Sequence, residues 1–311
     1  MSAIICGSFA YDHIMNFEDE FANHILPDKL HRLNLSFLVP SLRREFGGCA
    51  GNIAFNLKKI GGNPIAVGTV GNDFKSYEDW LKSHDIEASH LKIMADAYTA
   101  QAFITTDSTD NQITAFHPGA MNYSASNSVT GLKASIGIIS PDSKDGMTTH
   151  ASELFASKIP FIFDPGQGLP MFDGSELCEL IEMANWVTVN EYEAAMLEKK
   201  TGLTSLEISN KVDAYIVTLG EKGSKIMVKS ETLHVGIVEP MKIADPTGCG
   251  DAYRAGLLYG FSNSLELDST VKLASLLGAI KVESSGTQNH LLSREIVEEK
   301  YRTAFNENIR W

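Results

Sequence analysis

The sequence predicts an α/β protein in which a central, mostly parallel sheet carries helices on both faces, with a small β-sheet inserted as a lid. Three observations predict this fold. Short apolar runs typical of buried strands recur along the chain, and segments with helical periodicity lie between them. Two stretches in the first half instead alternate apolar and polar residues, as half-exposed strands do. The buried strands are expected at 3–6, 65–67, 136–139, 161–163, 186–189 and 215–217.

The helical segments are recognised by apolar residues that recur every three or four positions. Ile53, Leu57 and Ile60 have this spacing, and the glycine at position 61 ends the helix that they predict. A second such helix is expected over 271–281. Because strands and helices alternate, the strands are expected to run parallel and to place ligands beyond their carboxyl ends.

The two alternating stretches predict the lid. One covers 33–39 and contains Leu35 and Phe37, and the other covers 98–104 and is followed by 112–116. Both are expected to form antiparallel strands with one face in water. We therefore assign residues 13–40 and 98–116 to the lid, and residues 1–12, 41–97 and 117–311 to an α/β catalytic domain. The sequence contains no internal repeat or long linker that would divide it further.

The composition limits what the protein can bind. Its 311 residues carry 26 Lys and Arg against 39 Asp and Glu, a net charge of −13. This acidic balance argues against a surface for nucleic acid or anionic membrane, and no stretch approaches the ~18 apolar residues of a membrane helix. The four cysteines lie far apart without a CxxC spacing, so neither disulfides nor a zinc knuckle are indicated. We expect a cytoplasmic protein whose partner is a small molecule.

The strongest motif is the segment 245–253, a Pro- and Gly-rich turn followed by a helix. Gly248 and Gly250 allow the backbone to approach a ligand closely. The free N–H groups of the helix N-terminus then form an anion site, and Asp251 in the first turn suits a general base. The alternative is a plain turn in which Asp251 only stabilises the helix start. Tyr253 at the third glycine position excludes a Rossmann fingerprint, and the absence of any Gly-Lys dipeptide excludes a P-loop.

Three further segments have both a functional and a structural interpretation. Asn190 and Glu193 follow a strand and resemble a capping box, or they steer hydrated Mg²⁺. The segment 46–52 contains Gly47, Gly48 and Asn52, which form either a hinge and ligand contact or an ordinary loop and helix cap.

The segment 218–223, with Thr218, Gly220 and Gly223, borders a ligand or makes only a hairpin turn. Asp12, just after the first strand, binds hydroxyl groups or caps a turn.

Taken together, these pieces resemble the PfkB (ribokinase-like) family of carbohydrate and nucleoside kinases over nearly the whole chain. Each piece is weak alone, and their order makes the resemblance specific. Within the family, the segments 45–52 and 248–256 look most like those of bacterial adenosine kinases. The resemblance rests on Asp12, Gly47 with Gly48 and Asn52, the run Gly61, Gly68, Gly71 and Asp73, Asn190 with Glu193, Thr218 with Gly220, and the segment 245–251.

The resemblance implies a ribokinase-like fold and transfer of the ATP γ-phosphoryl group to a primary hydroxyl, the 5′-hydroxyl of adenosine, which yields AMP in purine salvage. It makes Asp251 the base and assigns the amides of Gly248, Cys249 and Gly250 to an anion hole. Glu193 with Asn190 would place Mg²⁺ through water, and Thr218, Gly220 and Gly223 would border ATP. Asp245 and Thr247, with the segment 283–286, resemble the family's monovalent-cation loop, usually occupied by K⁺.

The same resemblance assigns the acceptor site. Asp12 and Asn52 would bind ribose hydroxyls, Gly47 and Gly48 would border the acceptor, and Gly48 would be the hinge of lid closure. Apolar walls around the base are expected from Leu35, Phe37 and Phe116, whose alternative role is packing of the lid. Cys249 departs from the alanine usual in this turn, and a thiol at a helix N-terminus is expected to have a lowered pKa.

Two other functions remain open at this point. A sugar kinase of the same family, acting on ribose or a ketose, would need polar contacts where a base needs apolar walls. A sensor on the same fold would bind the ligand without turnover. Such a sensor would not need a base, so the presence of Asp251 argues against this function. The sequence allows either a monomer or a homodimer.

Overall fold

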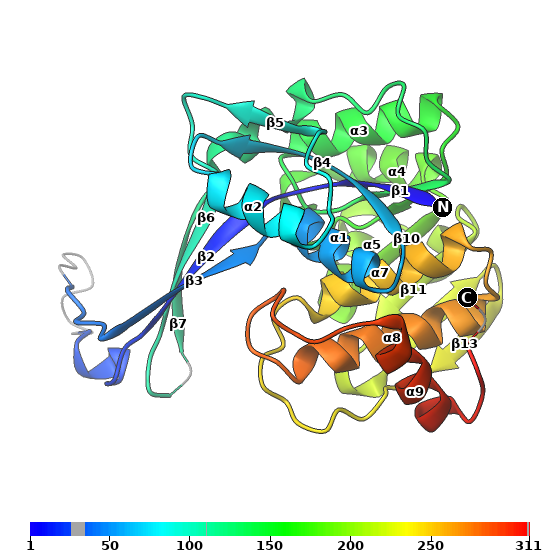
Figure 1. Ribbon diagram of the computed structural model, residues 1–311. Coiled ribbons are helices and arrows are strands. Elements are labelled where there is room, and N and C mark those ends of the chain that lie inside the picture. The colour runs from blue at the N-terminus through cyan, green and yellow to red at the C-terminus, as the bar shows by residue number, and fades with distance from the viewer. Residues whose placement is uncertain (26–34, 110, 310) are drawn as a thin grey trace.

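Two separate sheets organise the protein, as the computed structural model shows for residues 1–25, 35–109, 111–309 and 311 (Figure 1). The larger sheet has nine strands in the order β13-β12-β11-β10-β9-β8-β1-β4-β5. From β11 to β5 all neighbouring strands run parallel, and β12 and β13 add an antiparallel edge. The strands are β1 (Ser2–Cys6), β4 (Asn63–Gly71), β5 (Leu91–Met94), β8 (Ile136–Ile139), β9 (Phe161–Phe163), β10 (Trp186–Asn190), β11 (Ala214–Thr218), β12 (Ser224–Val228) and β13 (Glu231–Val235).

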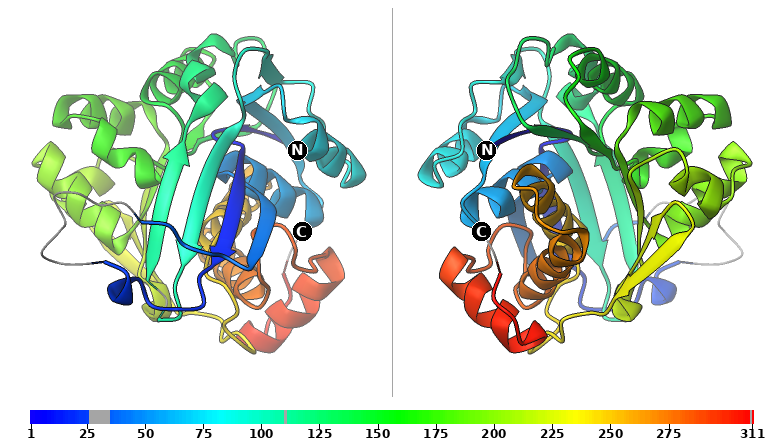
Figure 2. Two further views of the ribbon diagram at one scale, coloured as in Figure 1. Left: turned by 90° about the vertical axis from the view of Figure 1, so that its left-hand side faces the viewer. Right: turned by 90° about the vertical axis from the view of Figure 1, so that its right-hand side faces the viewer.

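Helices cover both faces of this sheet, which confirms the predicted layers (Figure 2). Alternate residues of each strand belong to opposite cores: Ile5 packs with one set of helices and Ile4 with the other. The first set is α1 (Cys49–Lys59), α2 (Lys75–Ser83), α7 (Cys249–Ser262), α8 (Leu267–Val282) and α9 (Arg294–Phe305). The second set is α3 (Lys144–Ala156), α4 (Gly174–Met183), α5 (Glu191–Thr201) and α6 (Ser205–Ser209).

The smaller sheet projects from one side of the large one and has the order β3-β2-β6-β7 (Figure 1). Its strands are β2 (Ala10–Asn16), β3 (Ser41–Gly47), β6 (Ala100–Thr106) and β7 (Gln112–His117). An inserted lid sheet was predicted and is confirmed. Its central pair, β2 and β6, runs parallel, so the prediction of purely antiparallel strands is wrong for this pair.

The strand predicted over 33–39 is also wrong where the structure describes it. Residues 33 and 34 lie outside the described residues, and residues 35–39 form no strand. The aromatic ring of Phe37 instead packs against Phe17 and Phe21, with ring centroids 4.8 and 5.1 Å apart. The neighbouring segment Ser41–Gly47, which was assigned to the catalytic domain, supplies the sheet's edge strand.

The lid meets the main sheet where the ligand site was expected. β1 leads within a few residues into β2, and β3 leads directly into α1, so both connections lie at the carboxyl end of β1. Parallel β9, β10 and β11 end at the same edge of the sheet. This edge is the usual ligand position in open α/β sheets. Within the described ranges, no helix is long and apolar enough to cross a membrane.

Candidate active site

The centre of the site is Asp251, in the first turn of α7. The side chain of Asn52 in α1 donates a hydrogen bond from Nδ2 to Asp251 Oδ2 at 2.8 Å, although the two residues lie 199 positions apart. Burial raises the pKa of Asp251 to about 6, against the opposing effect of the Asn52 hydrogen bond. The negative charge of Asp164 raises this pKa further, and the positive charge of Arg254 lowers it. A carboxylate with this pKa is ionised at neutral pH and accepts a proton readily.

The N-terminus of α7 presents backbone amides beside Asp251. Gly248 has φ 80° and makes the left-handed turn into the helix, without a side-chain cap. In the part of the chain that the structure describes, the N–H groups of Gly248 and Gly250 donate to no acceptor. The N–H of Cys249 differs from the expectation, because it donates to the carbonyl of Pro246 at 3.2 Å. Two of the three expected amides are thus free for an anion.

The thiol of Cys249 also differs from the expectation. Burial raises its pKa to about 11, more than the positive charge of Lys281 lowers it. The prediction of a lowered pKa is therefore wrong, because the effect of removing the thiolate from water exceeds that of the helix N-terminus.

A second side-chain amide orients Asn52, and no motif in the sequence pointed to it. Gln288 donates from Nε2 to Asn52 Oδ1 at 3.0 Å and accepts the indole N–H of Trp80 at 2.9 Å on its Oε1. Trp80 can only donate, so it fixes which end of the Gln288 amide is nitrogen. Gln288 then fixes Asn52 in the same way, and the Asn52 NH₂ group faces Asp251. This chain of bonds determines the hydrogen bond that Asp251 receives.

Asp12 lies in β2 at the inner edge of the lid. Its carboxylate occupies the space beside Gly47, where an added Cβ would lie 2.4 Å from Asp12 Oδ2. Burial raises the pKa of Asp12 to about 6, and the charges of Glu45 and Asp245 add to this. Burial raises the pKa of the Tyr77 hydroxyl, and the negative charges of Asp12 and Asp251 raise it further, so both carboxylates lie near this hydroxyl.

Gly48, the predicted hinge residue, has φ 87° and is packed against backbone. An added Cβ would lie 2.6 Å from the N of Ala10 and from the carbonyl oxygen of Ser8. The hydroxyl of Ser8 accepts the N–H of Cys49 at 3.1 Å, which caps α1. At the predicted hinge, the backbone is therefore closely packed where β1, β2 and β3 meet.

Asn190 and Glu193 form the capping box that was the structural alternative. Asn190 Oδ1 accepts the N–H of Glu193, and Glu193 Oε2 accepts the N–H of Asn190, both at 2.8 Å. Burial raises the pKa of Glu193, against the hydrogen bond from Asn190. Thr218 pairs with Asn190 across β10 and β11, and Gly220 and Gly223, with φ 57° and 84°, shape the following turn. These residues lie together at the carboxyl ends of two strands.

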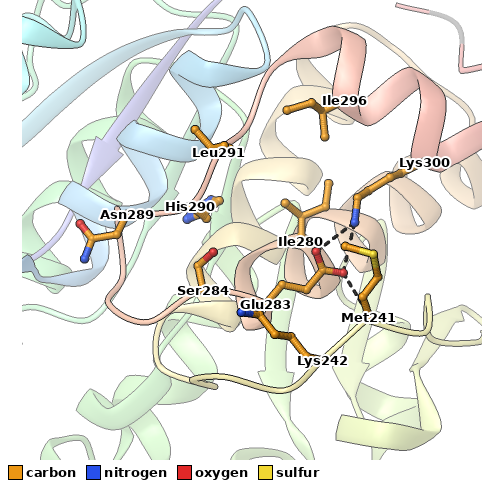
Figure 3. Close-up of a pocket in the computed structure, with 10 residues that line it drawn as sticks. All are labelled: Met241, Lys242, Ile280, Glu283, Ser284, Asn289, His290, Leu291, Ile296 and Lys300. Carbon is orange, nitrogen blue, oxygen red and sulfur yellow. Dashed lines mark hydrogen bonds and ion pairs between the residues drawn. The ribbon is translucent and has the colours of Figure 1, made fainter.

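Asp245 joins the turn before α7 to the loop after α8. Its Oδ1 accepts the N–H of Thr247 and its Oδ2 the N–H of Gly286, both at 2.9 Å. Burial raises the pKa of Asp245, but these hydrogen bonds outweigh it, so the pKa is lowered. The loop after α8 begins at Glu283, whose carboxylate accepts the N–H of Met241 and the ammonium of Lys300. These three residues line a cavity of about 430 Å³ (Figure 3).

Residues 9–294 match the family described as pfkB family carbohydrate kinase. The chain belongs to this family. It is a kinase that transfers a phosphoryl group to an alcohol, with the ribokinase-like fold. The predicted resemblance to PfkB kinases is thus confirmed.

Two solved structures and one further relative, all nucleoside kinases, are similar to this protein over almost the entire chain. The chain is 45% identical to a Burkholderia thailandensis nucleoside kinase in complex with inosine, with a TM-score of 0.90 and coverage of 98% of this chain and 99% of that chain. The same enzyme in complex with ADP-inosine gives 46% identity, a TM-score of 0.88 and coverage of 99% and 97%. A Methanocaldococcus jannaschii nucleoside kinase is 33% identical over 306 residues, 96% of this chain and 97% of the relative.

A buried ion pair of this PfkB kinase was also missed by the sequence analysis. Arg254 donates from Nε and Nη2 to the two carboxylate oxygens of Asp164 at 3.0 and 2.9 Å. Arg254 is 6% exposed and Asp164 3% exposed. Arg254 lies one turn after Asp251 in α7, and Asp164 directly follows β9. The pair therefore ties the helix that carries Asp251 to the central sheet.

The kinase's expected base-pocket walls are separated in the structure. Phe116 lies in the same cross-strand row as Ala102 and Asp12, so it shares the lid face that carries Asp12. Its side chain is 50% exposed. Phe37 packs in the aromatic cluster with Phe17 and Phe21, and Leu35 is exposed near it in sequence. Only Phe116 is therefore placed on the face of Asp12 by strand register.

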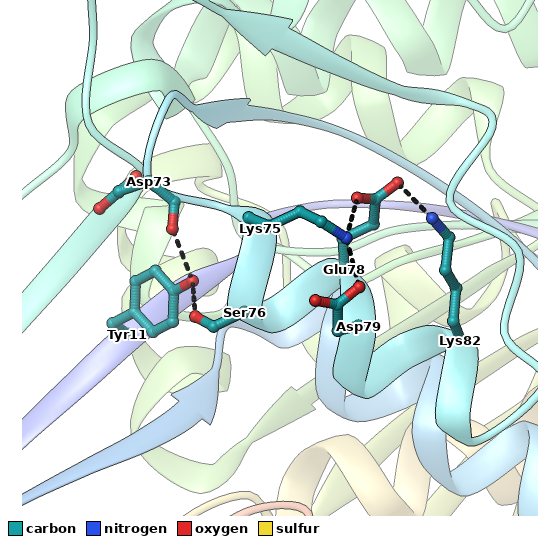
Figure 4. Close-up of polar contacts among 7 residues, drawn as sticks. All are labelled: Tyr11, Asp73, Lys75, Ser76, Glu78, Asp79 and Lys82. Carbon is teal, nitrogen blue, oxygen red and sulfur yellow. Dashed lines mark hydrogen bonds and ion pairs between the residues drawn. The ribbon is translucent and has the colours of Figure 1, made fainter.

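The lid is fastened to the body of the kinase at Asp73 (Figure 4). The hydroxyl of Tyr11 in β2 donates to the carbonyl of Asp73 at 3.0 Å and lies 2.9 Å from the hydroxyl of Ser76. The Asp73 carboxylate accepts the N–H and the hydroxyl of Thr99 at the start of β6, both at 2.7 Å. The next turns of α2 carry exposed ion pairs among Lys75, Glu78, Asp79 and Lys82 (Figure 4).

Proposed function

We propose that this kinase transfers the γ-phosphoryl group of ATP to the 5′-hydroxyl of a nucleoside, with adenosine as the acceptor and AMP as the product. The observation that carries the proposal is Asp251, held by Asn52 beside the free amides of Gly248 and Gly250. The likeness to a Burkholderia thailandensis nucleoside kinase whose structures contain inosine supports a nucleoside acceptor. The reaction would serve purine salvage in the cytoplasm.

In this mechanism Asp251 accepts the proton of the 5′-hydroxyl as its oxygen forms a bond to the γ-phosphorus and the bond to the β-phosphate oxygen breaks. The amides at the start of α7 hold the charge on the transferring group, since phosphoryl transfer depends mainly on alignment and electrostatic stabilisation. The Asn52 NH₂ group keeps the Asp251 carboxylate oriented. The raised pKa of Asp251 makes it a better proton acceptor than an exposed aspartate.

Asp12 and Asn52 would bind the ribose hydroxyls, and Phe116 would offer an apolar face to the base. Gly47 would border the acceptor, and Gly48 would act as the hinge that brings this lid face over the acceptor, which would exclude water from the phosphoryl group. Leu35 and Phe37 belong to the proposed pocket only if lid closure moves them toward Asp12.

ATP would lie along Thr218, Gly220 and Gly223. Glu193 and Asn190 would hold Mg²⁺ through water, and the ion would neutralise phosphate charge. The donor set fits this indirect mode, because Glu193 is already bonded to the N–H of Asn190, and no cluster of three ligands is found in the described ranges.

The test is ADP release with Mg-ATP against adenosine, inosine, guanosine, ribose and fructose. Turnover with adenosine in preference to the free sugars supports the proposal. Turnover with inosine or guanosine but not adenosine would retain the nucleoside class and contradict the acceptor. Turnover with ribose or fructose alone would establish the sugar-kinase alternative, and tight adenosine binding without turnover would establish a sensor. Sedimentation of the same protein would distinguish a monomer from a homodimer.

A further inference from the structure

Lys281 is a fully buried lysine in the last turn of α8, with 0% of its surface exposed. Its ammonium donates to the carbonyl oxygen of Asp245 at 2.8 Å and to that of Ser284 at 3.2 Å. These carbonyls come from the turn before α7 and from the loop after α8. Burial lowers the pKa of Lys281, whereas the negative charges of Asp245 and Asp251 raise it. The ammonium is thus a buried charge held between two backbone segments.

The same two segments are joined around Lys281 by backbone groups. The N–H groups of Ala244 and Asp245 donate to the carbonyl of Val282 at 2.8 and 3.2 Å. The Asp245 carboxylate is occupied by the N–H groups of Thr247 and Gly286. The N–H groups of Asp245 and Thr247 and the Asp245 carboxylate are therefore paired, and the carbonyl of Asp245 accepts the ammonium.

This donor set does not fit the monovalent cation expected at Asp245 and Thr247. A cation such as K⁺ binds by exchanging its water for several backbone carbonyl or carboxylate oxygens. Here two of the carbonyls accept from an ammonium and both carboxylate oxygens accept from amides. A second cation in this place would also lie beside the like charge of the buried Lys281 ammonium, which would repel it.

We propose that Lys281 is a built-in cation that replaces K⁺ and holds the anion-binding turn of α7, and this proposal rests on the kinase function proposed above. Lys281 is a positioning residue, since it contacts the turn and not the reacting atoms. Its bond to Asp245 fixes the residue that begins the 245–248 turn. Gly248 in turn packs beside Thr287 of the loop, where an added Cβ would lie 3.2 Å from Thr287 Cγ2. The amides of Gly248 and Gly250 are thereby set without an added ion.

The experiment compares turnover in K⁺ with turnover in choline at equal ionic strength, for the wild type and for Lys281→Met. We expect the wild type to be equally fast in both salts. Because a displacement of ~1 Å in an active site can cost ~10²-fold in rate, Lys281→Met should lose roughly 10- to 100-fold in choline and regain much of this in K⁺. Lys272→Met is the matched control, since Lys272 lies on the same helix but pairs with Asp268 and Glu307. It should remain indifferent to K⁺.

A second measurement does not depend on catalysis. K⁺ should raise the melting temperature of Lys281→Met relative to choline and leave that of the wild type unchanged. Crystals of Lys281→Met soaked in Tl⁺ should show an anomalous peak beside the carbonyls of Asp245 and Ser284. A wild type that requires K⁺, or a folded Lys281→Met that neither binds Tl⁺ nor responds to K⁺, would overturn the proposal.

If Lys281→Met does not fold, the comparison of wild-type turnover in K⁺ and in choline still tests the proposal. If no acceptor is phosphorylated, the proposed function fails, while the Tl⁺ and melting measurements continue to test Lys281.

Discussion

At the scale of single residues, the pKa of a carboxylate in the site depends on burial, which raises it, and on hydrogen bonds to the charged form, which lower it. Asp251 and Asp12 are both removed from water, and the pKa of each is raised to about 6. Asp251 receives the Asn52 hydrogen bond, which favours its charged form, whereas Asp12 lies beside two further carboxylates, Glu45 and Asp245. Both carboxylates are therefore ionised at neutral pH but close to their titration range.

Asp251→Asn should lower kcat by about 10²- to 10⁴-fold, the usual contribution of a general base. The asparagine can still accept the Asn52 hydrogen bond through its oxygen, so the fold and the affinity for adenosine should be retained. Steady-state turnover and calorimetric titration with adenosine measure the two effects. A variant that keeps its turnover would remove Asp251 from the mechanism.

The pH dependence has a defined direction. Proton transfer needs ionised Asp251, so kcat should be steady at neutral pH and fall as the pH drops through about 6. Because Asp12 titrates in the same range, the profile is also measured with Asp12→Asn, which should weaken acceptor binding but keep the acid limb of kcat. Loss of that limb in Asp12→Asn would assign the titration to Asp12.

At the scale of elements, α7 is held in place by contacts with elements from distant parts of the chain. Its first turns are tied to β9 through Arg254 and Asp164, and to α1 through Asn52. The loop after α8 reaches α1 through Gln288, which donates to the same Asn52 side chain. The turn that carries Asp251 therefore depends on contacts among elements that are distant in sequence.

Arg254→Met should lower the free energy of unfolding by about 3–5 kcal/mol, since it leaves the Asp164 carboxylate buried without its partner. The double variant Arg254→Met with Asp164→Leu should recover most of this loss, because neither member of the pair then leaves the other as an unpaired buried charge. Urea unfolding of the two variants, with Asp164→Leu alone to complete the cycle, measures the difference. Equal destabilisation in the single Arg254 variant and the double variant would show that lost packing, not an unpaired charge, is the cause.

Gln288→Leu should lower both stability and kcat. It leaves the amide oxygen of Asn52 and the indole N–H of Trp80 without partners, at a cost of about 1–3 kcal/mol for each group that stays buried. Asn52 can then rotate away from Asp251, so kcat should fall more than adenosine affinity. Asn289→Ala is the control on the same loop, because its amide reaches only exposed groups, Glu45 and Ser285. A Gln288 variant that loses stability but keeps kcat would limit Gln288 to a structural role.

At the scale of the whole molecule, the two sheets differ in how they are covered. Helices enclose the large sheet on both faces, whereas every residue of β7 in the lid is exposed. Exposed backbone hydrogen bonds open more readily than buried ones. We therefore expect a bound ligand to protect the backbone hydrogen bonds of the lid more than those of the large sheet.

Hydrogen exchange should show this difference. Amides of β6 and β7 should exchange faster than those of β1 and β8 in the free protein. Adenosine with a non-hydrolysable ATP analogue should slow exchange in the lid strands and at the start of α1, and leave the central strands unchanged. Mass spectrometry of peptic fragments resolves these segments. Lid exchange that stays unchanged at saturating ligand would contradict closure over the acceptor.

The layers of the fold and the motif at 245–251 could be predicted from the sequence alone. Apolar runs such as 136–139 and 161–163 became buried parallel strands, because a strand covered on both faces needs apolar residues at every position. The edge strand Ser41–Gly47 was missed, since it carries charged residues on its exposed surface and has no such pattern.

The contacts that hold the site together became visible only in the folded protein. Three hydrogen-bonded pairs join residues that are distant in sequence. Asn52 and Asp251 lie 199 positions apart, Gln288 and Asn52 lie 236 apart, and Arg254 and Asp164 lie 90 apart. Hydrophobic periodicity and turn chemistry report local preferences, and they carry no information on which distant polar groups become partners. Burial makes these pairings decisive, because a polar group or charge removed from water must find its partner inside the fold.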